Sequence, residues 1–256
     1  MTSTDPARQS DLDPAALRSP DPTGADEVGH THADVSGGWL RAAVFGAMDG
    51  LVTNVSLVAG IGAAGAAPRT IVLTGVAGLV SGAFSMALGE YASVRTQNEQ
   101  VDAEAIKERR ELATNPEAEE AELAEMFGAM GLSTATATTA AREVHADPEK
   151  AVKLHLTQEL GVDPDEQPSP YVAAGSSFVM FALGAIIPIV PYLLGYASLL
   201  AGLLCGAVGL LLAGGVAATF TSAPRWKGAL RQLLFGVIAA GATYLVGLAI
   251  GVAPAG

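Results

Sequence analysis

Five long runs of apolar residues, separated by polar breaks, dominate the pattern of this chain. They cover residues 39–63, 70–93, 171–194, 197–220 and 229–252. A helix needs roughly 20 predominantly apolar residues to cross the hydrocarbon core of a bilayer, and each run is long enough. The pattern therefore predicts an all-α, polytopic membrane protein with five transmembrane helices.

One long polar stretch, residues 95–168, lies between the second and third apolar runs. Asn115-Pro116 and Asp147-Pro148 are typical helix starts, because Asn and Asp cap a helix and proline fits its first turn. Helices are expected from the second run to about residue 112, over 116–130 and over 148–160, with a further short helix over 135–144. The sequence thus predicts a helical domain inserted between the second and third transmembrane helices.

The first 37 residues are polar, acidic and rich in proline, and they contain no apolar stretch of the kind found in a signal peptide. Such a segment buries too little surface to offset its ordering entropy, so we expect a disordered tail without a cleavable signal. Its Glu27, His30, His32 and Asp34 are weak evidence for metal binding, and we expect the tail to be inert. The predicted division is a tail (1–37), two transmembrane helices (38–94), the insert (95–168) and three further transmembrane helices (169–256).

Composition agrees with a membrane protein and restricts the partners. Half of the residues are hydrophobic, 16% are charged, and the mean hydropathy is +0.38, which is too apolar for an ordinary soluble domain. The formal net charge of -12 comes mainly from the tail and from residues 99–166, which argues against a nucleic-acid partner. The single cysteine, Cys205, lies in an apolar run and is expected to be a small buried hydrophobe.

Basic residues near the ends of the apolar runs predict the orientation in the membrane. Those expected on one side are Arg41, Arg95, Arg225, Lys227 and Arg231, and the one on the other side is Arg69. Since basic residues are enriched on the cytoplasmic side, the N-terminus and the insert should face the cytoplasm. The lack of a targeting peptide fits a bacterial plasma membrane.

Asp49 is a carboxylate inside the first apolar run, FGAMDGLVTNVSLVAG. An acid within the membrane is costly, so ion or proton handling is the default interpretation. The second run contains Met86 and Glu90 in SMALGEYAS. A thioether and a carboxylate could line an ion path, although methionine is more often core filler and Glu90 could equally be an interfacial anchor.

The insert carries carboxylates at spacings that place pairs of side chains on one helix face. The pairs are Glu108 and Glu111, Glu119 and Glu122, and His155 and Glu159. Oxygen ligands with one imidazole suit a divalent first-row ion such as Fe²⁺ or Mn²⁺. The alternative is a solvated acidic surface whose glutamates pair with Lys107, Arg109 and Arg110.

Several separated motifs together resemble the vacuolar iron transporter family from Trp39 onward. They are MDGLVTNVSLVAG, SGAFSMALGEYASV, NPEAEEAE, QELG and IIPIVPYLL. The resemblance implies five transmembrane helices, a homodimer with the ion path at the subunit interface, and a cytoplasmic three-helix metal-binding domain. The activity that it implies is export of Fe²⁺, and often Mn²⁺, from the cytosol in exchange for protons.

The resemblance also assigns roles to single residues. It implies an ion path along Asp49 and Met86, and metal ligands at Glu108, Glu111, Glu119, Glu122 and Glu159. His155 stands where a methionine ligand is typical, which leaves the choice among Fe²⁺, Mn²⁺, Co²⁺ and Zn²⁺ open. Binding through a histidine should weaken as pH falls through about 6.5. Gly78 stands where some members carry a glutamate, so proton coupling would depend on Asp49 and on Glu90.

A membrane-anchored iron store or ferroxidase is the alternative from another class. Di-iron sites in helical bundles use Glu-x-x-His on two packed helices. Here that spacing occurs at Glu27 and His30, within the tail. We therefore expect a transporter and not an enzyme.

Overall fold

The structure, a computed structural model, describes residues 38–220 and 223–251. Within these residues the regular elements are helices, and no strand is present. Five helical segments are long and apolar enough to cross a membrane, which confirms the predicted number. The tail, with Glu27, His30, His32 and Asp34, lies outside the described residues.

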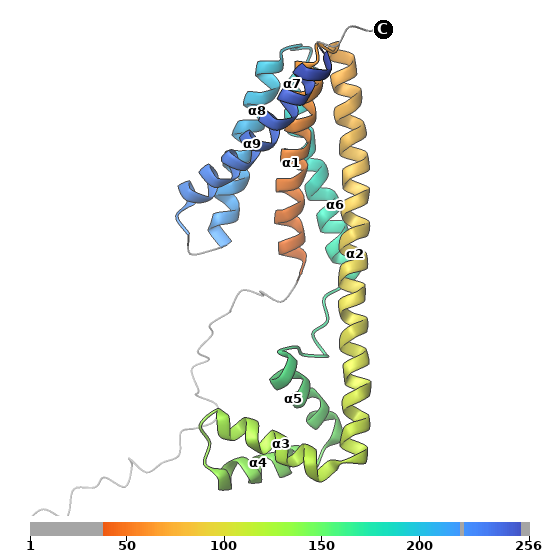
Figure 1. Cartoon of the computed structure of the whole chain (residues 1–256), viewed down its shortest axis with the longest axis vertical. Helices are drawn as coiled ribbons and strands as arrows, with labels where there is room; N and C mark the ends of the chain where they lie inside the picture. Colours follow the sequence, from red (N-terminus) through yellow and green to blue (C-terminus); the bar gives the residue numbers. More distant parts are fainter. Residues whose placement is uncertain (1–37, 221–222, 252–256) are drawn as a thin grey trace, which may run out of the picture. The chain divides into compact units, whose positions relative to one another are not determined.

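The first two spanning helices, α1 (Trp39–Ala63) and α2 (Pro68–Thr114), form a hairpin (Figure 1). Gly65 in the connecting turn has φ 78°, a left-handed conformation that glycine adopts at little cost. Pro68 occupies the first turn of α2, where its missing N–H would be unpaired in any case. The chain therefore reverses direction within a few residues.

Helix α2 is continuous over 47 residues. Its first half is apolar and its second half is charged, so one helix includes the second predicted transmembrane segment and the start of the insert (Figure 1). The prediction of a helix extending to about residue 112 is confirmed. There is no break in the helix at the predicted boundary near residue 94.

The third span is interrupted near its end, where it contains two prolines. It consists of α6 (Pro170–Ile186), a 3₁₀ turn (Ile187–Ile189) and α7 (Val190–Leu193). Pro188 and Pro191 lack the N–H that a continuous α-helix needs, so the helix changes to 3₁₀ geometry between them.

The last two spans are α8 (Leu199–Ala217), extended by a 3₁₀ turn (Ala218–Phe220), and α9 (Arg225–Gly251). Cys205 in α8 is free and only partly buried, so the prediction of a buried cysteine was wrong in degree. Helix α9 begins earlier than the predicted residue 229. The N–H of Lys227 donates to the carbonyl of Pro224, so the helix starts directly after a proline, in polar sequence that the apolar pattern left out.

Glycines allow α1 and α6 to approach closely. A Cβ atom on Gly50 would overlap the carbonyl of Phe181, and one on Gly184 would overlap the carbonyl of Ala47. Without a hydrophobic driving force between helices in lipid, such close backbone packing is a main source of helix association. These two glycines therefore fix the distance between the helices.

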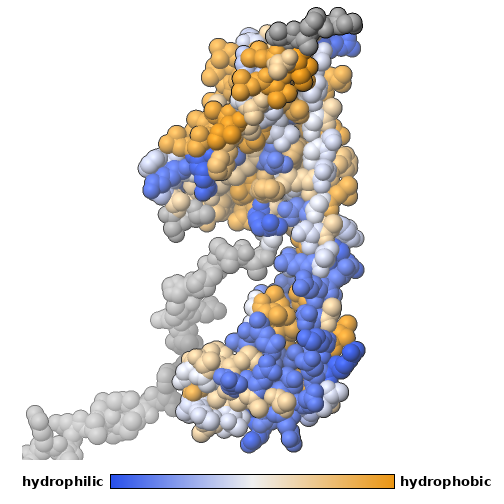
Figure 2. All heavy atoms as spheres, in the orientation of Figure 1, coloured by the Kyte–Doolittle hydropathy of each residue, from blue (hydrophilic) through white to orange (hydrophobic). Residues whose placement is uncertain are grey.

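The insert contains α3 (Pro116–Ala129), α4 (Thr134–His145) and α5 (Pro148–Leu160) after the charged half of α2. All three predicted helices are present, including the short one. Side chains of Ala105 on α2 and of Val152 and Leu156 on α5 form a small core. Figure 2 shows that hydrophilic residues predominate on the visible surface of this region and apolar residues on that of the spanning helices.

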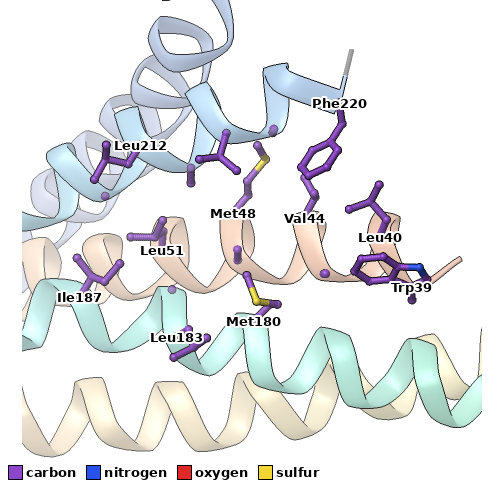
Figure 3. A pocket seen from close by; sticks show the side chains of 17 residues that line it. Trp39, Leu40, Val44, Met48, Leu51, Met180, Leu183, Ile187, Leu212 and Phe220 are labelled. Carbon is purple, nitrogen blue, oxygen red and sulfur yellow. The ribbon is translucent and has the colours of Figure 1, made fainter. Parts of the chain in front are cut away.

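An apolar groove of about 450 Å³ lies between α1, α6 and α8 (Figure 3). Trp39 and Phe220 lie at one end, and the thioethers of Met48 and Met180 lie along it. Its lining is apolar and aromatic, so it offers no negative charge to a cation. Asp49 is not among the residues that line it.

Candidate metal centre

Three helices of the insert bring two carboxylates and one imidazole together. Glu108 lies on α2, Glu119 on α3 and His155 on α5, and their nearest ligand atoms all lie within 4.8 Å of one another. The exposed fractions of the three residues are 6%, 7% and 0%. Glutamates are almost never buried unless they are paired, so this grouping is unusual for a merely solvated acidic surface.

The imidazole of His155 occupies the middle of the cluster. Its Nδ1 atom lies 3.3 Å from Oε1 of Glu108, 3.9 Å from Oε2 of Glu119 and 3.0 Å from Oε1 of Glu159. The contact with Glu159 has hydrogen-bond geometry. Oε1 of Glu108, in contrast, is buried and has no hydrogen-bond partner among the described residues.

Local chain geometry explains why these residues meet. Helix α2 ends at Thr114, and α3 begins at Pro116 after a single capping residue, so the chain turns back and brings Glu119 near Glu108. Helix α5 starts after Asp147, whose side chain accepts a hydrogen bond from the N–H of Lys150, an N-cap of the usual kind. Its core contacts with α2 then place His155 beside Glu108.

The electrostatics of the cluster favour a bound cation. The pKa of Glu108 is raised to about 7, mainly by burial; His155 opposes this rise, and the nearby carboxylates of Glu159, Glu119 and Glu111 contribute to it. Burial also raises the pKa of Glu119, and the nearby charge of Glu122 adds to this effect. A divalent ion would compensate the repulsion and the lost hydration together.

The six predicted ligands do not contribute equally. Glu108, Glu119 and His155 form the buried cluster, and Glu159 joins it through its hydrogen bond to His155 while its side chain stays 34% exposed. Glu111 is partly buried and Glu122 is exposed. These last two affect the cluster through their charge and are not within its 4.8 Å grouping.

The alternative of a neutralised acidic surface can be compared with the ion pairs. Lys107 lies 3.7 Å from Glu104, and Arg109 lies 2.7 Å from Glu149. These basic residues thus pair with carboxylates outside the cluster.

The membrane residues have separate surroundings in this chain. Asp49 on α1 is partly buried, and the hydroxyl of Thr53 donates a hydrogen bond of 3.4 Å to its Oδ1. Met86 on α2 packs against the buried side chains of Ala83 and Phe181. These two of the three predicted path residues therefore have different contacts: Asp49 is bonded within α1, and Met86 packs against side chains of α2 and α6.

Glu90 is 8% exposed and forms an ion pair of 3.2 Å with Arg41. The pair connects α2 to α1 at the end of α1 that begins the first span. Arg41 is mostly exposed, with 70% of its side chain accessible. Of the two partners, only Glu90 is therefore removed from water. This contact gives Glu90 a partner that the sequence pattern did not predict.

Two polar residues escaped the sequence analysis. Asn54 on α1 is fully buried, and its Nδ2 donates to the carbonyls of Gly75 and Ala185 at 3.0 and 2.5 Å. His145 ends α4, and its ring lies against that of His155. The sequence signal for Asn54 was an amide within an apolar run. The signal for His145 was its residue type, since the chain has only four histidines.

The fold and the cluster define a class: a multi-pass helical membrane protein with a carboxylate and histidine centre in a helical insert. The VIT family model matches residues 40–248, so the chain belongs to the VIT family. This match confirms the resemblance found in the sequence.

Curated relatives agree with the family match. A vacuolar iron transporter of Acanthamoeba castellanii is 37% identical over 224 residues, covering 86% of this chain and 82% of the relative. Vacuolar iron transporter homolog 3 of Arabidopsis thaliana is 32% identical and covers 80% of each chain. Vacuolar iron transporter 1 of Eucalyptus grandis is 28% identical, covering 84% and 88%. These relatives are named as transporters, in agreement with a protein that is not an enzyme.

Proposed function

We propose that this protein is a proton-coupled transporter that exports or sequesters Fe²⁺, with Mn²⁺ as a second substrate, from the cytosol. The observation that carries the proposal is the buried cluster of Glu108, Glu119 and His155 in a member of a family whose relatives are named iron transporters. The centre combines carboxylate oxygens with imidazole nitrogen, a set that suits Fe²⁺ and Mn²⁺ and also admits Co²⁺ and Zn²⁺.

The insert, residues 95–168, acts as a cytoplasmic metal-binding domain that captures the ion. Glu111, Glu122 and Glu159 surround the buried cluster and increase the local negative charge. Such charge concentrates cations near a site before they bind. The insert thereby raises the metal concentration near the cytoplasmic mouth of the path.

Asp49 carries the ion and the proton through the membrane in turn, together with Met86 and with Glu90 nearer the cytoplasmic end. A carboxylate can hold a partly dehydrated divalent ion, and protonation of the same group releases it. Asp49 is only partly buried within one chain, as expected for a group that faces a second subunit. We therefore propose a homodimer with the path at the subunit interface.

The proposed orientation places the N-terminus and the insert in the cytoplasm. Arg41 lies at the start of α1, and Arg225, Lys227 and Arg231 lie in the first turns of α9, so basic residues gather at the ends of the spans that would face the cytoplasm. We propose a bacterial plasma membrane, where export from the cytosol protects against excess iron.

Anaerobic Fe²⁺ flux in sealed proteoliposomes, with and without an imposed pH gradient, tests the proposal. We expect a gradient-driven flux that is lost in Asp49→Asn and partly retained in Asp49→Glu, which keeps the charge. Metal binding to the insert should be unchanged in both variants. Full flux in Asp49→Asn would contradict the role of Asp49, and absence of flux in intact dimeric protein would contradict the transport function.

The alternative is a membrane-anchored iron store or ferroxidase. It is favoured by the same buried cluster but needs a second metal position close by. Oxygen consumption by the full chain on addition of Fe²⁺, with formation of Fe³⁺ in stoichiometric amounts, would support this alternative over transport.

A further inference from the structure

His145 is oriented as histidine ligands commonly are. Its Nδ1 lies 2.8 Å from the carbonyl oxygen of Ala141. A carbonyl oxygen can only accept a hydrogen bond, so Nδ1 carries the proton and Nε2 of the neutral ring holds a lone pair. Metal-ligating histidines almost always donate their other ring N–H to a carbonyl or carboxylate in this way, which fixes the tautomer.

The free nitrogen of His145 has no partner of its own. Its Nε2 atom is buried and lacks a hydrogen-bond partner among the described residues, and the same is true of Nε2 of His155. A buried acceptor without a partner costs about 1–3 kcal/mol. Two such nitrogens beside a carboxylate cluster therefore indicate a ligand that accepts their lone pairs.

The two imidazole rings are close enough to share one ion. Their centres lie 5.4 Å apart, with the ring planes at 87°. Two imidazoles on one tetrahedral ion, with metal–nitrogen bonds of about 2.0–2.1 Å, have ring centres roughly 5 Å apart. His145 lies outside the grouping of ligand atoms within 4.8 Å of one another, so α4 has to shift towards α5 for both rings to reach one metal.

We propose that His145, through Nε2, is a further ligand of the ion held by Glu108, Glu119 and His155. The centre then has four ligand residues, one on each of four helices. The carboxylates come from α2 and α3, and the imidazoles come from α4 and α5. Such a set selects first-row ions such as Fe²⁺, Co²⁺ and Zn²⁺ against Mg²⁺ and Ca²⁺, which prefer oxygen ligands. This inference rests on the proposed function, because it concerns the same centre.

The test counts the imidazoles on the metal in the full-length protein. The chain has four histidines, so His30→Gln and His32→Gln are introduced in every sample to remove the tail's two. With one equivalent of Co²⁺, X-ray absorption should find two imidazoles per ion in this background protein. One imidazole per ion would overturn the proposal.

Affinity for Co²⁺ gives an independent measurement. We expect His145→Gln, and His145→Phe, which keeps a ring against His155, to weaken binding about tenfold or more, as loss of groups around a metal typically does. Glu143→Gln, an exposed change on the same helix, should have no effect. Unchanged affinity in both His145 variants would also overturn the proposal.

The outcomes separate this proposal from the proposed function. If the background protein binds Co²⁺ with one imidazole, the capture role of the insert stands and only the role of His145 fails. If it binds no Co²⁺ and His155→Phe changes nothing, the metal centre itself fails and both proposals fall. Unfolding midpoints of each variant, measured without metal, show whether a loss of binding is a loss of fold.

Discussion

Nδ1 of His155 lies 3.3 Å from Oε1 of Glu108, yet the two atoms do not form a hydrogen bond. Nδ1 forms its hydrogen bond with Glu159 instead, so this oxygen of Glu108 is left buried without a partner among the described residues. A cation beside Glu108 would satisfy that oxygen, and the first two predictions concern this carboxylate.

Replacement of Glu108 by glutamine should remove most metal binding by the insert. Glu108→Gln keeps the shape of the side chain but removes the charge that compensates a divalent ion, so we expect at least a tenfold loss of Co²⁺ or Mn²⁺ affinity in calorimetry, a change of about 1.4 kcal/mol. Glu104→Gln on the same helix breaks only the exposed contact with Lys107 and should behave as the wild type. Equal affinities for the two variants would contradict the assignment.

The metal-free insert should lose stability as pH rises from about 4.5 to about 7. The pKa of Glu108 in the folded protein is raised to about 7 from 4.5, so the folded state holds its proton more tightly than the unfolded state. The contribution is therefore fully present at low pH and is lost as pH rises through the folded pKa. The groups that face Glu108 are His155 and Glu159 on α5, Glu119 on α3 and Glu111 on its own helix.

Unfolding midpoints measured across this pH range check the prediction. In Glu108→Gln the pH dependence should be smaller, because the titrating group is gone. Metal affinity should change in the opposite sense and rise with pH, since the ion must displace the proton. A wild-type midpoint that rises steadily from pH 5 to 7 without metal would be inconsistent with the raised pKa.

The close contact of α1 and α6 predicts different effects for two similar substitutions on α6. Gly184→Ala introduces a Cβ against the carbonyl of Ala47, and overpacking of this kind costs about 1–3 kcal/mol. Gly175→Ala has open space around it and should be neutral or slightly stabilising. Thermal unfolding in detergent distinguishes them, and similar midpoints would show that the helices can separate at little cost.

Asn54 should be a stabilising bridge among three spans. It donates from α1 to carbonyls of α2 and α6, and hydrogen bonds between membrane helices contribute about 0.6 kcal/mol on average. Asn54→Ala should therefore lower stability by about 1–2 kcal/mol, because it removes both bonds and leaves a cavity. Ser81→Ala, exposed on α2, is the control, and an unchanged midpoint for Asn54→Ala would argue against the bridge.

Local pattern predicted the helices well because length and caps are properties of short segments. The bounds of α1 and α5 agree with the predicted ones, and Asn115-Pro116 marked the start of α3. The start of α9 was missed, since its first turn is polar and adds nothing to an apolar run. The tail remains a prediction.

The site was predicted as pairs, and the structure buries one member of each glutamate pair. Residues three apart differ by about 60° around a helix axis, so both members can share a broad face while only one enters a narrow contact. Helix α5 packs on α2 along Ala105 and Leu112, a line that includes Glu108 and leaves Glu111 at its margin. The choice depends on which helix packs where, and spacing along one helix does not contain that information.

His145 was missed for a similar reason. A single histidine at the end of a helix has no second potential ligand three or four residues away on the same helix. Its significance comes from its contact with the ring of His155 on the next helix. The orientation of its nitrogen depends on a hydrogen bond to its own helix, which appears only in three dimensions.

The continuity of α2 also sets a time requirement. At about 1.5 Å per residue, Met86 and Glu108 are about 33 Å apart along this one helix. Under the proposed function, an ion captured at Glu108 must therefore dissociate fully before it can enter the proposed path. With association at about 10⁸–10⁹ M⁻¹s⁻¹, a site with a dissociation constant of about 1 μM would release its ion within about 1–10 ms. A site a thousandfold tighter would retain it for seconds, so a centre that supplies a transporter works best when its affinity is moderate.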